Sequence, residues 1–121
     1  MSTLKLDTLS NKAGTASVPS DTIVSGTAKA WVNFNGTGTV AIRRAFNVSS
    51  ITDNGTGEYT VNFTNSMADA NYSAILSTTV LAFEPRIGAP TVYSTSSVRI
   101  EVGYGTFINQ DQEMVNVTVF S

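Results

Sequence analysis

Cysteine and histidine are both absent from this sequence of 121 residues. Without cysteine the chain has no disulfide bond, no thiolate nucleophile and no cysteine metal centre. Without histidine it has no histidine general base, no serine–histidine triad and no zinc site of the HExxH type. These absences favour a protein without a resident metal or cofactor.

Charge is the next scarce property. Charged residues make up 13% of the chain, about half of the roughly 25% that is typical of globular domains. Seven basic residues face nine acidic ones, so the net charge is −2 and nothing draws the chain to nucleic acid or anionic lipid. No apolar run approaches the roughly 20 residues of a membrane helix. Residues 1–7 lack a basic start followed by an apolar stretch, so we expect no secretory signal.

Apolar side chains are also scarce in residues 1–27, which we call the leader. Apart from Met1, Val24 and a few alanines, the apolar residues of the leader are Leu4, Leu6, Leu9, Val18 and Ile23. So few apolar groups cannot offset an ordering entropy of about 1–2 kcal/mol per residue. We therefore predict that the leader is disordered or orders against other copies of the chain, as extended chain, a short helix or strands exchanged between protomers.

Small polar residues fill the composition instead: Ser, Thr, Asn and Gly account for 50 of the 121 residues. Beyond the leader, apolar residues alternate with polar ones, and a period of two predicts strands. Residues 72–81 form one further apolar run. The alternating apolar positions are Ala28, Ala30, Val32 and Phe34; Val40, Ile42, Phe46 and Val48; Tyr59, Val61 and Phe63; Val98, Ile100, Val102 and Tyr104; and Val115, Val117 and Val119.

Turn signals separate these runs. Asn35-Gly36 and Asn54-Gly55 each join two alternating segments, which is a strong hairpin signal. Residues 67–71, 82–90 and 109–113 are predicted loops, and no stretch of 12 or more residues carries a helical apolar stripe. We predict an all-β fold, with residues 28–121 as an antiparallel sandwich-like domain of six or seven strands.

Trp31 is the only tryptophan, and it shares a strand face with Lys29, Asn33 and Asn35. A tryptophan on a polar face could stack on a sugar ring or anchor a subunit interface. If the strand is buried on both faces, Trp31 belongs to the core. We favour core or intersubunit packing over ligand stacking.

Arg43 and Arg44 are adjacent, so a regular strand would point one of them to the face of Val40 and Ile42. One interpretation is an inward arginine paired across a subunit contact. The other, which we favour, is a strand end where Arg44 reaches solvent. A β-bulge would also relieve the conflict.

Two loop regions offer candidate receptor contacts, because exposed loops with aromatic and charged groups suit recognition. An ordinary hairpin connection or an intersubunit contact is the alternative for both. Residues 53–58 superficially resemble a calcium loop but lack its acidic spacing, so we predict a hairpin turn. No cleft can be inferred around Asp111 and Glu113, so we predict no enzyme. The candidate receptor contacts are Phe83, Glu84, Arg86, Tyr93, Asn109, Gln110 and Asp111.

The central part of the chain carries a recognisable series of motifs. They run Gly26-Thr27-Ala28-Lys29-Ala30-Trp31-Val32-Asn33-Phe34-Asn35-Gly36-Thr37-Gly38-Thr39-Val40-Ala41-Ile42-Arg43, then Phe46-Asn47-Val48-Ser49-Ser50-Ile51-Thr52-Asp53-Asn54-Gly55-Thr56-Gly57, Tyr59-Thr60-Val61-Asn62-Phe63 and Asp69-Ala70-Asn71-Tyr72. This series resembles a module of tail-fibre and related virion proteins of tailed bacteriophages, especially cyanophages and marine phages. Leu4-Lys5-Leu6-Asp7-Thr8-Leu9 is similar to the leader before that module. The resemblance covers about half of the chain, and Arg44 departs from the small or polar residue of the family pattern.

The resemblance implies a structural virion component, usually trimeric, at or near the tip that contacts the host. It does not imply an enzyme. Self-association also has a physical reason. The leader has few apolar residues and the sheet edges are exposed, and neighbouring protomers can cover both. The number three comes from the resemblance alone. The candidate intersubunit contacts are Leu4, Leu6, Leu9, Val18, Ile23, Trp31, Arg43 and Arg44.

The favoured hypothesis is a homotrimeric tail-fibre or tail-tip protein of the virion, made in the host cytoplasm. Its leader would attach to other tail or baseplate proteins, and its β-domain would contact a host-surface glycan or protein. One alternative is a structural baseplate or fibre-network component without receptor contact. Another is a carbohydrate-binding module, which requires a solvent-facing Trp31.

Overall fold

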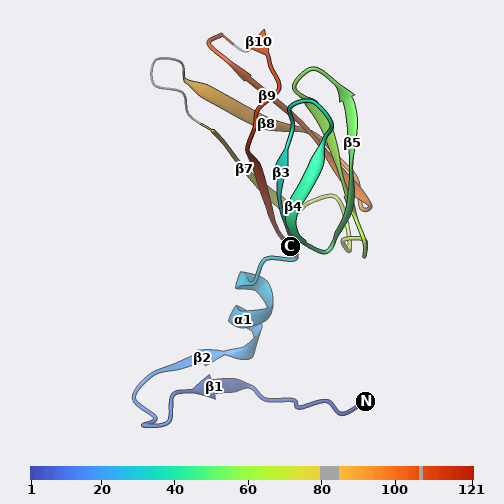
Figure 1. The fold of residues 1–121 in the computed structure, drawn as a ribbon. Helices are drawn as coiled ribbons and strands as arrows, with labels where there is room; N and C mark the ends of the chain where they lie inside the picture. Colours follow the sequence, from blue (N-terminus) through green and yellow to red (C-terminus); the bar gives the residue numbers. More distant parts are fainter. Residues whose placement is uncertain (80–84, 107) are drawn as a thin grey trace.

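Two antiparallel sheets face each other in the computed structural model of the chain, which describes residues 1–79, 85–106 and 108–121 (Figure 1). The first sheet has the order β4-β3-β11-β7, with bounds β4 (Ala41–Phe46), β3 (Ala30–Asn35), β11 (Val115–Phe120) and β7 (Ser73–Thr78). The second has the order β10-β9-β6-β5, with bounds β10 (Ile108–Asn109), β9 (Ser97–Tyr104), β6 (Glu58–Phe63) and β5 (Val48–Gly55). An additional strand, β8 (Arg86–Tyr93), pairs with β9. The predicted all-β, antiparallel, sandwich-like fold is confirmed.

The core lies between the sheets and consists of the side chains that the alternation pointed inward. Edge-to-face ring contacts tie its two halves together: Phe34 meets Tyr59 with ring centroids 5.2 Å apart, and Phe63 meets Tyr72 at 5.8 Å. The predicted inward positions on β3, β6, β9 and β11 are confirmed. The buried apolar side chains are Ala30, Val32, Phe34, Tyr59, Val61, Phe63, Met67, Tyr72, Val98, Ile100, Val102, Val115, Val117 and Val119.

The predicted run over residues 40–48 is not one strand. Asn47 has a φ of 55° and ends β4, and the chain then crosses to the second sheet as β5. Asparagine tolerates this left-handed conformation because its side chain can bond locally. Here its amide nitrogen donates to the carbonyls of Lys29 and Asn65, and its amide oxygen accepts from the Asn65 N–H. Asn47 thus fastens three segments at the end of the sandwich nearest the leader.

The predicted loop over residues 82–90 is wrong in its second half, because Arg86 to Pro90 lie on β8. Among the described residues this strand pairs with β9 alone, so its proline lies on an edge strand, where proline is tolerated. The register shifts between Pro90 and Val92. Phe83 and Glu84 lie outside the described residues.

The other predicted connections are loops or turns, except that Asn109, the first residue of the predicted 109–113 loop, lies on β10. Asn35-Gly36 begins a loop of residues 36–40 between β3 and β4, and Asn54-Gly55 begins the turn between β5 and β6. Both turns carry the same tetrapeptide, Asn-Gly-Thr-Gly, and its second glycine is left-handed, with a φ of 60° at Gly38 and 68° at Gly57. Residues 67–71 form a loop. In the described part of residues 28–121 the strands number nine, more than the six or seven predicted.

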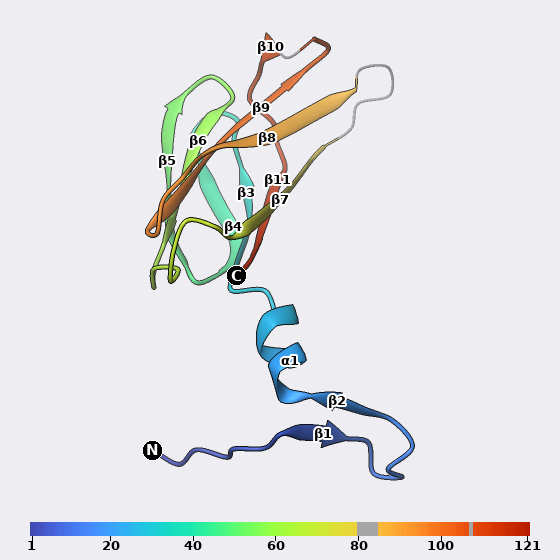
Figure 2. The ribbon, with the colours of Figure 1, turned by 180° about the vertical axis from the view of Figure 1, so that it is seen from behind.

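The leader forms a small structure of its own that projects from one end of the sandwich (Figure 2). A hairpin of β1 (Thr8–Ser10) and β2 (Ser17–Pro19) precedes the short helix α1 (Ser20–Gly26). Its turn is closed by the Asn11 side chain, whose oxygen accepts from the N–H groups of Thr15 and Ala16. Among the described residues, no helix has the length and apolarity to cross a membrane.

Candidate functional site

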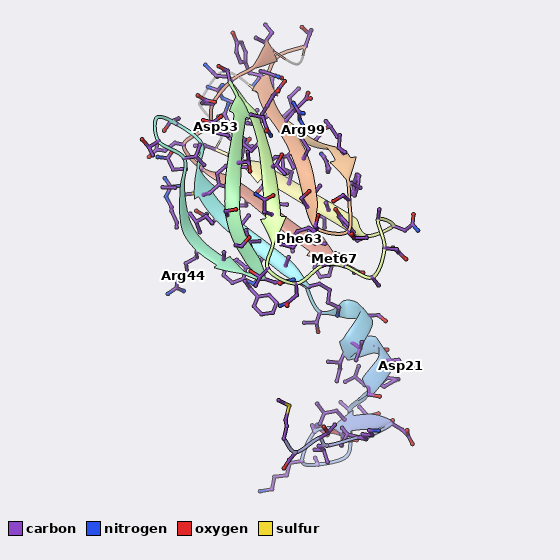
Figure 3. The ribbon with its side chains drawn as sticks, turned by 90° about the vertical axis from the view of Figure 1, so that its right-hand side faces the viewer. Asp21, Arg44, Asp53, Phe63, Met67 and Arg99 are labelled. Carbon is purple, nitrogen blue, oxygen red and sulfur yellow. The ribbon has the colours of Figure 1, made fainter. Side chains whose placement is uncertain are left out.

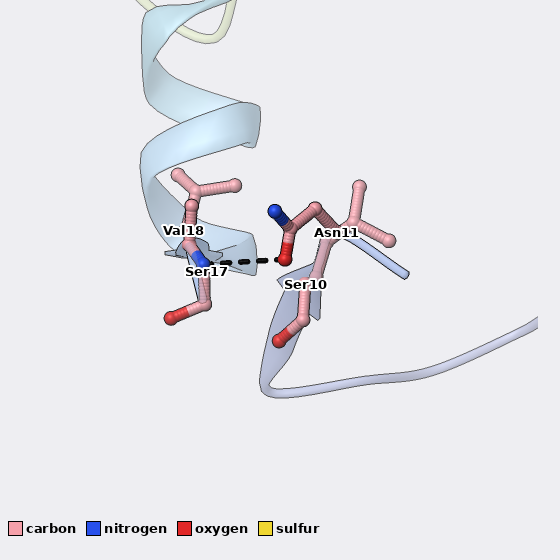
Figure 4. Close-up of a pocket in the computed structure, with 6 residues that line it drawn as sticks. Ser10, Asn11, Ser17 and Val18 are labelled. Carbon is pink, nitrogen blue, oxygen red and sulfur yellow. Dashed lines mark hydrogen bonds between the residues drawn. The ribbon is translucent and has the colours of Figure 1, made fainter. Parts of the chain in front are cut away.

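The apolar side chains of the leader are largely exposed. Leu4 is 85% exposed and Leu9 is 53% exposed, while Val18, paired with Leu9 in the hairpin, is only half-buried. Helix α1 buries no residue, and Ile23 and Val24 lie on its surface. Figure 4 shows the open hollow of the hairpin, with Asn11 opposite Ser17 and Val18. All five leader residues predicted as intersubunit contacts are therefore at least partly accessible, and the single chain supplies little to cover them.

The outer face of the β4-β3-β11-β7 sheet carries a row of large side chains, and we call this surface the Trp31 face. Trp31 lies opposite Phe46 of β4 on one side and Thr118 of β11 on the other. Thr118 in turn lies opposite Ile75 of β7, which completes a row across all four strands. Exposed fractions are 37% for Trp31, 54% for Phe46 and 57% for Ile75. The core interpretation of Trp31 is therefore wrong, whereas subunit contact and ligand stacking both remain open.

Polar groups border this row. The Asn33 amide nitrogen donates to the Asn116 side-chain oxygen at 2.6 Å, which joins β3 to β11 one step along the sheet. The Asn33 side-chain oxygen is buried without a hydrogen-bond partner among the described residues. Arg44 lies opposite Asn33 and extends away from the sandwich (Figure 3).

A β-bulge accounts for the two adjacent arginines. Asn33 pairs with Arg44 and Phe34 pairs with Ile42, so Arg43 is the extra residue. Arg43 donates to the backbone carbonyl of Glu113 at 2.7 Å, and the whole of β4 is exposed. Neither arginine points into the core, so the solvent interpretation of Arg44 holds and the inward arginine is wrong.

At the far end of the sandwich from the leader, which we call the distal end, Asp111 holds two turns in place. Its carboxylate accepts from the Tyr59 hydroxyl at 2.7 Å and from the Gly57 N–H at 2.8 Å. The Tyr59 hydroxyl also lies 2.8 Å from the carbonyl oxygen of Gly36, so its one proton is shared between two acceptors. Burial, and then the bond to Asp111, raise the pKa of Tyr59 far above its usual range. This carboxylate therefore positions the 36–40 and 55–57 turns instead of projecting to solvent.

A depression beside this anchor brings together three of the predicted receptor contacts from two separate segments. Arg86 donates to the Gln110 side-chain oxygen, and its guanidinium lies 5.6 Å from the centre of the Tyr104 ring. The cation is thus held by an amide and an aromatic face. The depression is lined by Thr37, Thr79, Arg86, Gln110, Asp111, Gln112 and Glu113.

Next to the depression, Glu58 is shared between two partners. Arg99 donates to its carboxylate at 2.7 Å, and Asn109 donates to it at 3.2 Å. Both members of this ion pair are partly exposed, so it contributes little stability. Asn109 therefore lies at the distal end with Gln110 and Asp111, as a partly exposed side chain.

Tyr93 does not join this group. It lies at the other end of β8, where its ring packs 5.1 Å from that of Tyr72. Phe46 and Ile75 were not predicted as contact residues. Alternation assigns a residue to one face of its own strand, but it does not show which residues of the neighbouring strands lie beside it. Among the described residues no group of three carboxylates gathers as a metal site, and residues 53–58 form the predicted hairpin turn.

Comparison with protein-family models, with curated proteins and with solved structures gave no match. The resemblance to phage tail-fibre proteins therefore rests on the motifs of residues 4–9 and 26–72 alone.

Proposed function

We propose that this chain is a subunit of a phage tail fibre or tail tip that contributes to attachment to the host-cell surface. In this proposal the leader assembles three copies and joins them to other tail or baseplate proteins. The distal end of the sandwich meets a glycan or protein of the host surface. The function is binding and assembly, with no reaction catalysed.

One observation carries the proposal: the leader stands away from a sandwich whose core is already complete. Its first residues, hairpin and helix expose Leu4, Leu9, Ile23 and Val24. A segment with such an exposed apolar surface gains stability when neighbouring chains cover it. An assembly segment at one end and fixed turns at the other are what a fibre subunit requires.

The distal depression suits weak polar recognition. Arg86 and Gln110 present a guanidinium and an amide, while Thr37 and Thr79 add hydroxyl groups. Such groups bind carboxylate- or hydroxyl-bearing surface polymers through hydrogen bonds. Three identical weak sites on one rigid assembly raise the avidity by about 10²–10⁴ when the sites engage together.

The experiment compares the purified full chain with two double variants of the leader. Leu6→Asp with Leu9→Asp places charges on the exposed apolar positions, and Thr3→Asp with Thr8→Asp adds the same charge to polar positions. Light scattering after size-exclusion chromatography should give three chain masses for the wild type and the threonine variant, and a lower mass for the leucine variant. A labelled-protein adsorption assay on a bacterial panel should show the same ranking.

Three results would count against parts of the proposal. A wild-type chain that is monomeric at micromolar concentration overturns it. An oligomer that adsorbs to no bacterium, while binding other tail proteins, favours the purely structural virion component. Equal masses for the two double variants would show that the leader does not direct assembly.

A carbohydrate-binding module is a second candidate, and the exposure of Trp31 favours it. An exposed indole beside the Asn33–Asn116 pair offers stacking and hydrogen bonding to a sugar. Titration of the full chain with a glycan panel should then quench the emission of Trp31, the only tryptophan. An unchanged spectrum across the panel removes this candidate.

A further inference from the structure

The two outer faces of the sandwich differ sharply in chemistry. The central row of the Trp31 face is Phe46, Trp31, Thr118 and Ile75. The equivalent row on the other sheet is Thr52, Thr60, Arg99 and Val92. Its next row, Ser50, Asn62 and Ser97, is also polar. An outer sheet face in contact with water is normally polar, so the Trp31 face is the exception that requires a partner.

The surface area of the whole chain, with its projecting leader, also leaves room for a contact between copies. The chain exposes 7529 Å². A compact monomer of 12.8 kDa exposes about 6,300 Å². The excess of about 1,200 Å² exceeds the roughly 800 Å² that each partner contributes to a standard protein interface. A single chain therefore holds enough uncovered surface for a stable contact between copies.

The leader and the Trp31 face are continuous. The leader passes directly into β3, the strand that carries Trp31, and Phe46 borders the junction. A depression at this junction is lined by Thr27, the last residue of the leader, together with Lys29, Phe46 and Asn47 of the sandwich. Chains that associate through their leaders therefore bring this face toward each other first.

The central row also has the electrostatics of a surface that can meet a copy of itself. None of its four side chains is charged, so the row itself brings no like charges together, and the neighbouring Arg44 extends away from the sandwich. The opposite face has Arg99 and Glu58 in its centre and has no such apolar row. The occupant that best fits the Trp31 face is a second copy of this chain.

We propose that the Trp31 face is a subunit interface that extends the leader contact onto the sandwich. This inference rests on the assembly step of the proposed function. It leaves the opposite sheet face and the distal depression free for the host surface. Trp31 is then an intersubunit anchor and not a ligand platform.

The chain offers a closely matched pair of variants to test this interface. Ile75 and Val92 are 57% and 56% exposed, lie on the edge strands β7 and β8, and end the central rows of the two faces. Ile75→Lys should raise the apparent dissociation constant of the full-length oligomer by about tenfold or more, because an unpaired charge is buried in the contact. Val92→Lys should leave it unchanged. Circular dichroism should show that both variants are folded.

A second measurement needs no variant. Acrylamide quenching of Trp31 in the wild type should be weak in the oligomer and stronger after dilution to single chains. Equal effects of the two lysine variants, or equal quenching in both states, would overturn the interface while leaving assembly through the leader intact. Quenching by a sugar without dissociation would assign the face to a glycan. A wild type that is monomeric would overturn the proposed function as well.

Discussion

Removing one buried oxygen atom should measurably weaken the distal end. In Tyr59→Phe the ring keeps its place against Phe34, with centroids 5.2 Å apart in the wild type. The hydroxyl that serves both Asp111 and Gly36 is lost. The perturbation therefore separates the hydrogen bonds from the packing.

The expected loss in the free energy of unfolding depends on the hydrogen-bond partners that Asp111 and Gly36 keep when the hydroxyl is removed. Tyr59 is fully buried, and its hydroxyl donates to a carboxylate, for which a net value of about 1.5–3 kcal/mol is typical. Asp111 keeps the Gly57 N–H as a donor, so its charge is not left entirely without a partner. We expect the free energy of unfolding to fall by about 2 kcal/mol. The double variant with Asp111→Asn should lose less than the sum of the two single losses.

The same hydroxyl gives a signature at high pH. The pKa of Tyr59 is raised in the folded chain, mainly by burial, whereas an unfolded tyrosine titrates near about 10. Above that pH the unfolded state releases a proton that the folded state retains, so stability is present below about pH 10 and is lost as the pH rises. The loss approaches about 1.4 kcal/mol per pH unit for one group. Tyr59→Phe should lack this part of the decline.

Urea unfolding followed by Trp31 emission, at one protein concentration and at several pH values from 7 to above 10, measures both effects. Tyr93→Phe is the matched control, because it removes the same atom from a partly exposed ring. A loss below about 0.5 kcal/mol at neutral pH, like that of an ordinary surface change, would refute the reasoning. So would identical alkaline slopes for the wild type and Tyr59→Phe.

Two further predictions concern backbone positions, and both are measured by urea unfolding. Gly57→Ala should cost about 3 kcal/mol or more, because the new Cβ meets the Val102 carbonyl oxygen at 2.3 Å in addition to the strain of φ 68°. Gly105→Ala, at φ 62° with no atom within 4 Å, should cost only about 1–2 kcal/mol, and equal losses would contradict the close approach. Asn47→Ala should cost about 2–3 kcal/mol, because it strands the carbonyls of Lys29 and Asn65. Asn71→Ala, on an exposed loop, should stay within about 0.5 kcal/mol, and a similar loss there would contradict the fastening role of Asn47.

The core was predictable because it depends only on the alternation of side chains between the two faces of each strand. Once a segment is a strand, every second side chain faces the same way, and Val98, Ile100 and Val102 needed no knowledge of their neighbours. The turns were predictable for a similar reason, since an Asn-Gly pair between two alternating segments is a local hairpin signal, although the left-handed residues are the second glycines, Gly38 and Gly57. Both signals are local, and both were confirmed.

The strand over residues 86–93 was not predictable from the same rules. It contains a proline and a glycine, which normally interrupt strands, and only the tertiary structure shows why they occur in this one. Pro90 is tolerated on an edge strand, and the sequence does not state which strands are edges. Gly88 is needed for close packing, since a Cβ there would lie 2.1 Å from the Leu76 side chain of β7. Proline and glycine indicate a loop only when no neighbouring strand requires them.

The distal site was half predictable. The two segments predicted as exposed loops are partly buried, and Arg86 lies on a strand, but Arg86 and Gln110 do meet in one depression. The pattern did not show that Asp111 is turned toward the buried Tyr59. A tyrosine at an inward position was the available signal, because its hydroxyl needs a buried partner. Tyr93 was grouped with Arg86 because the two are close in the sequence, but they lie at opposite ends of β8, a strand of eight residues.

The Trp31 face shows where sequence reasoning stops in this fold. Parity placed Trp31 on the outer side of its strand, yet a single exposed aromatic is common on protein surfaces. The row arises only from register, which brings Phe46 and Ile75 into line with Trp31 although they lie 15 and 44 residues further along the chain. The bulge at Arg43 decides this alignment, because a regular register continued from the Phe34–Ile42 pair would place Phe46 opposite the buried Ala30 and turn it to the other face. The arginine pair that was puzzling in the sequence is therefore what places the second aromatic beside the first.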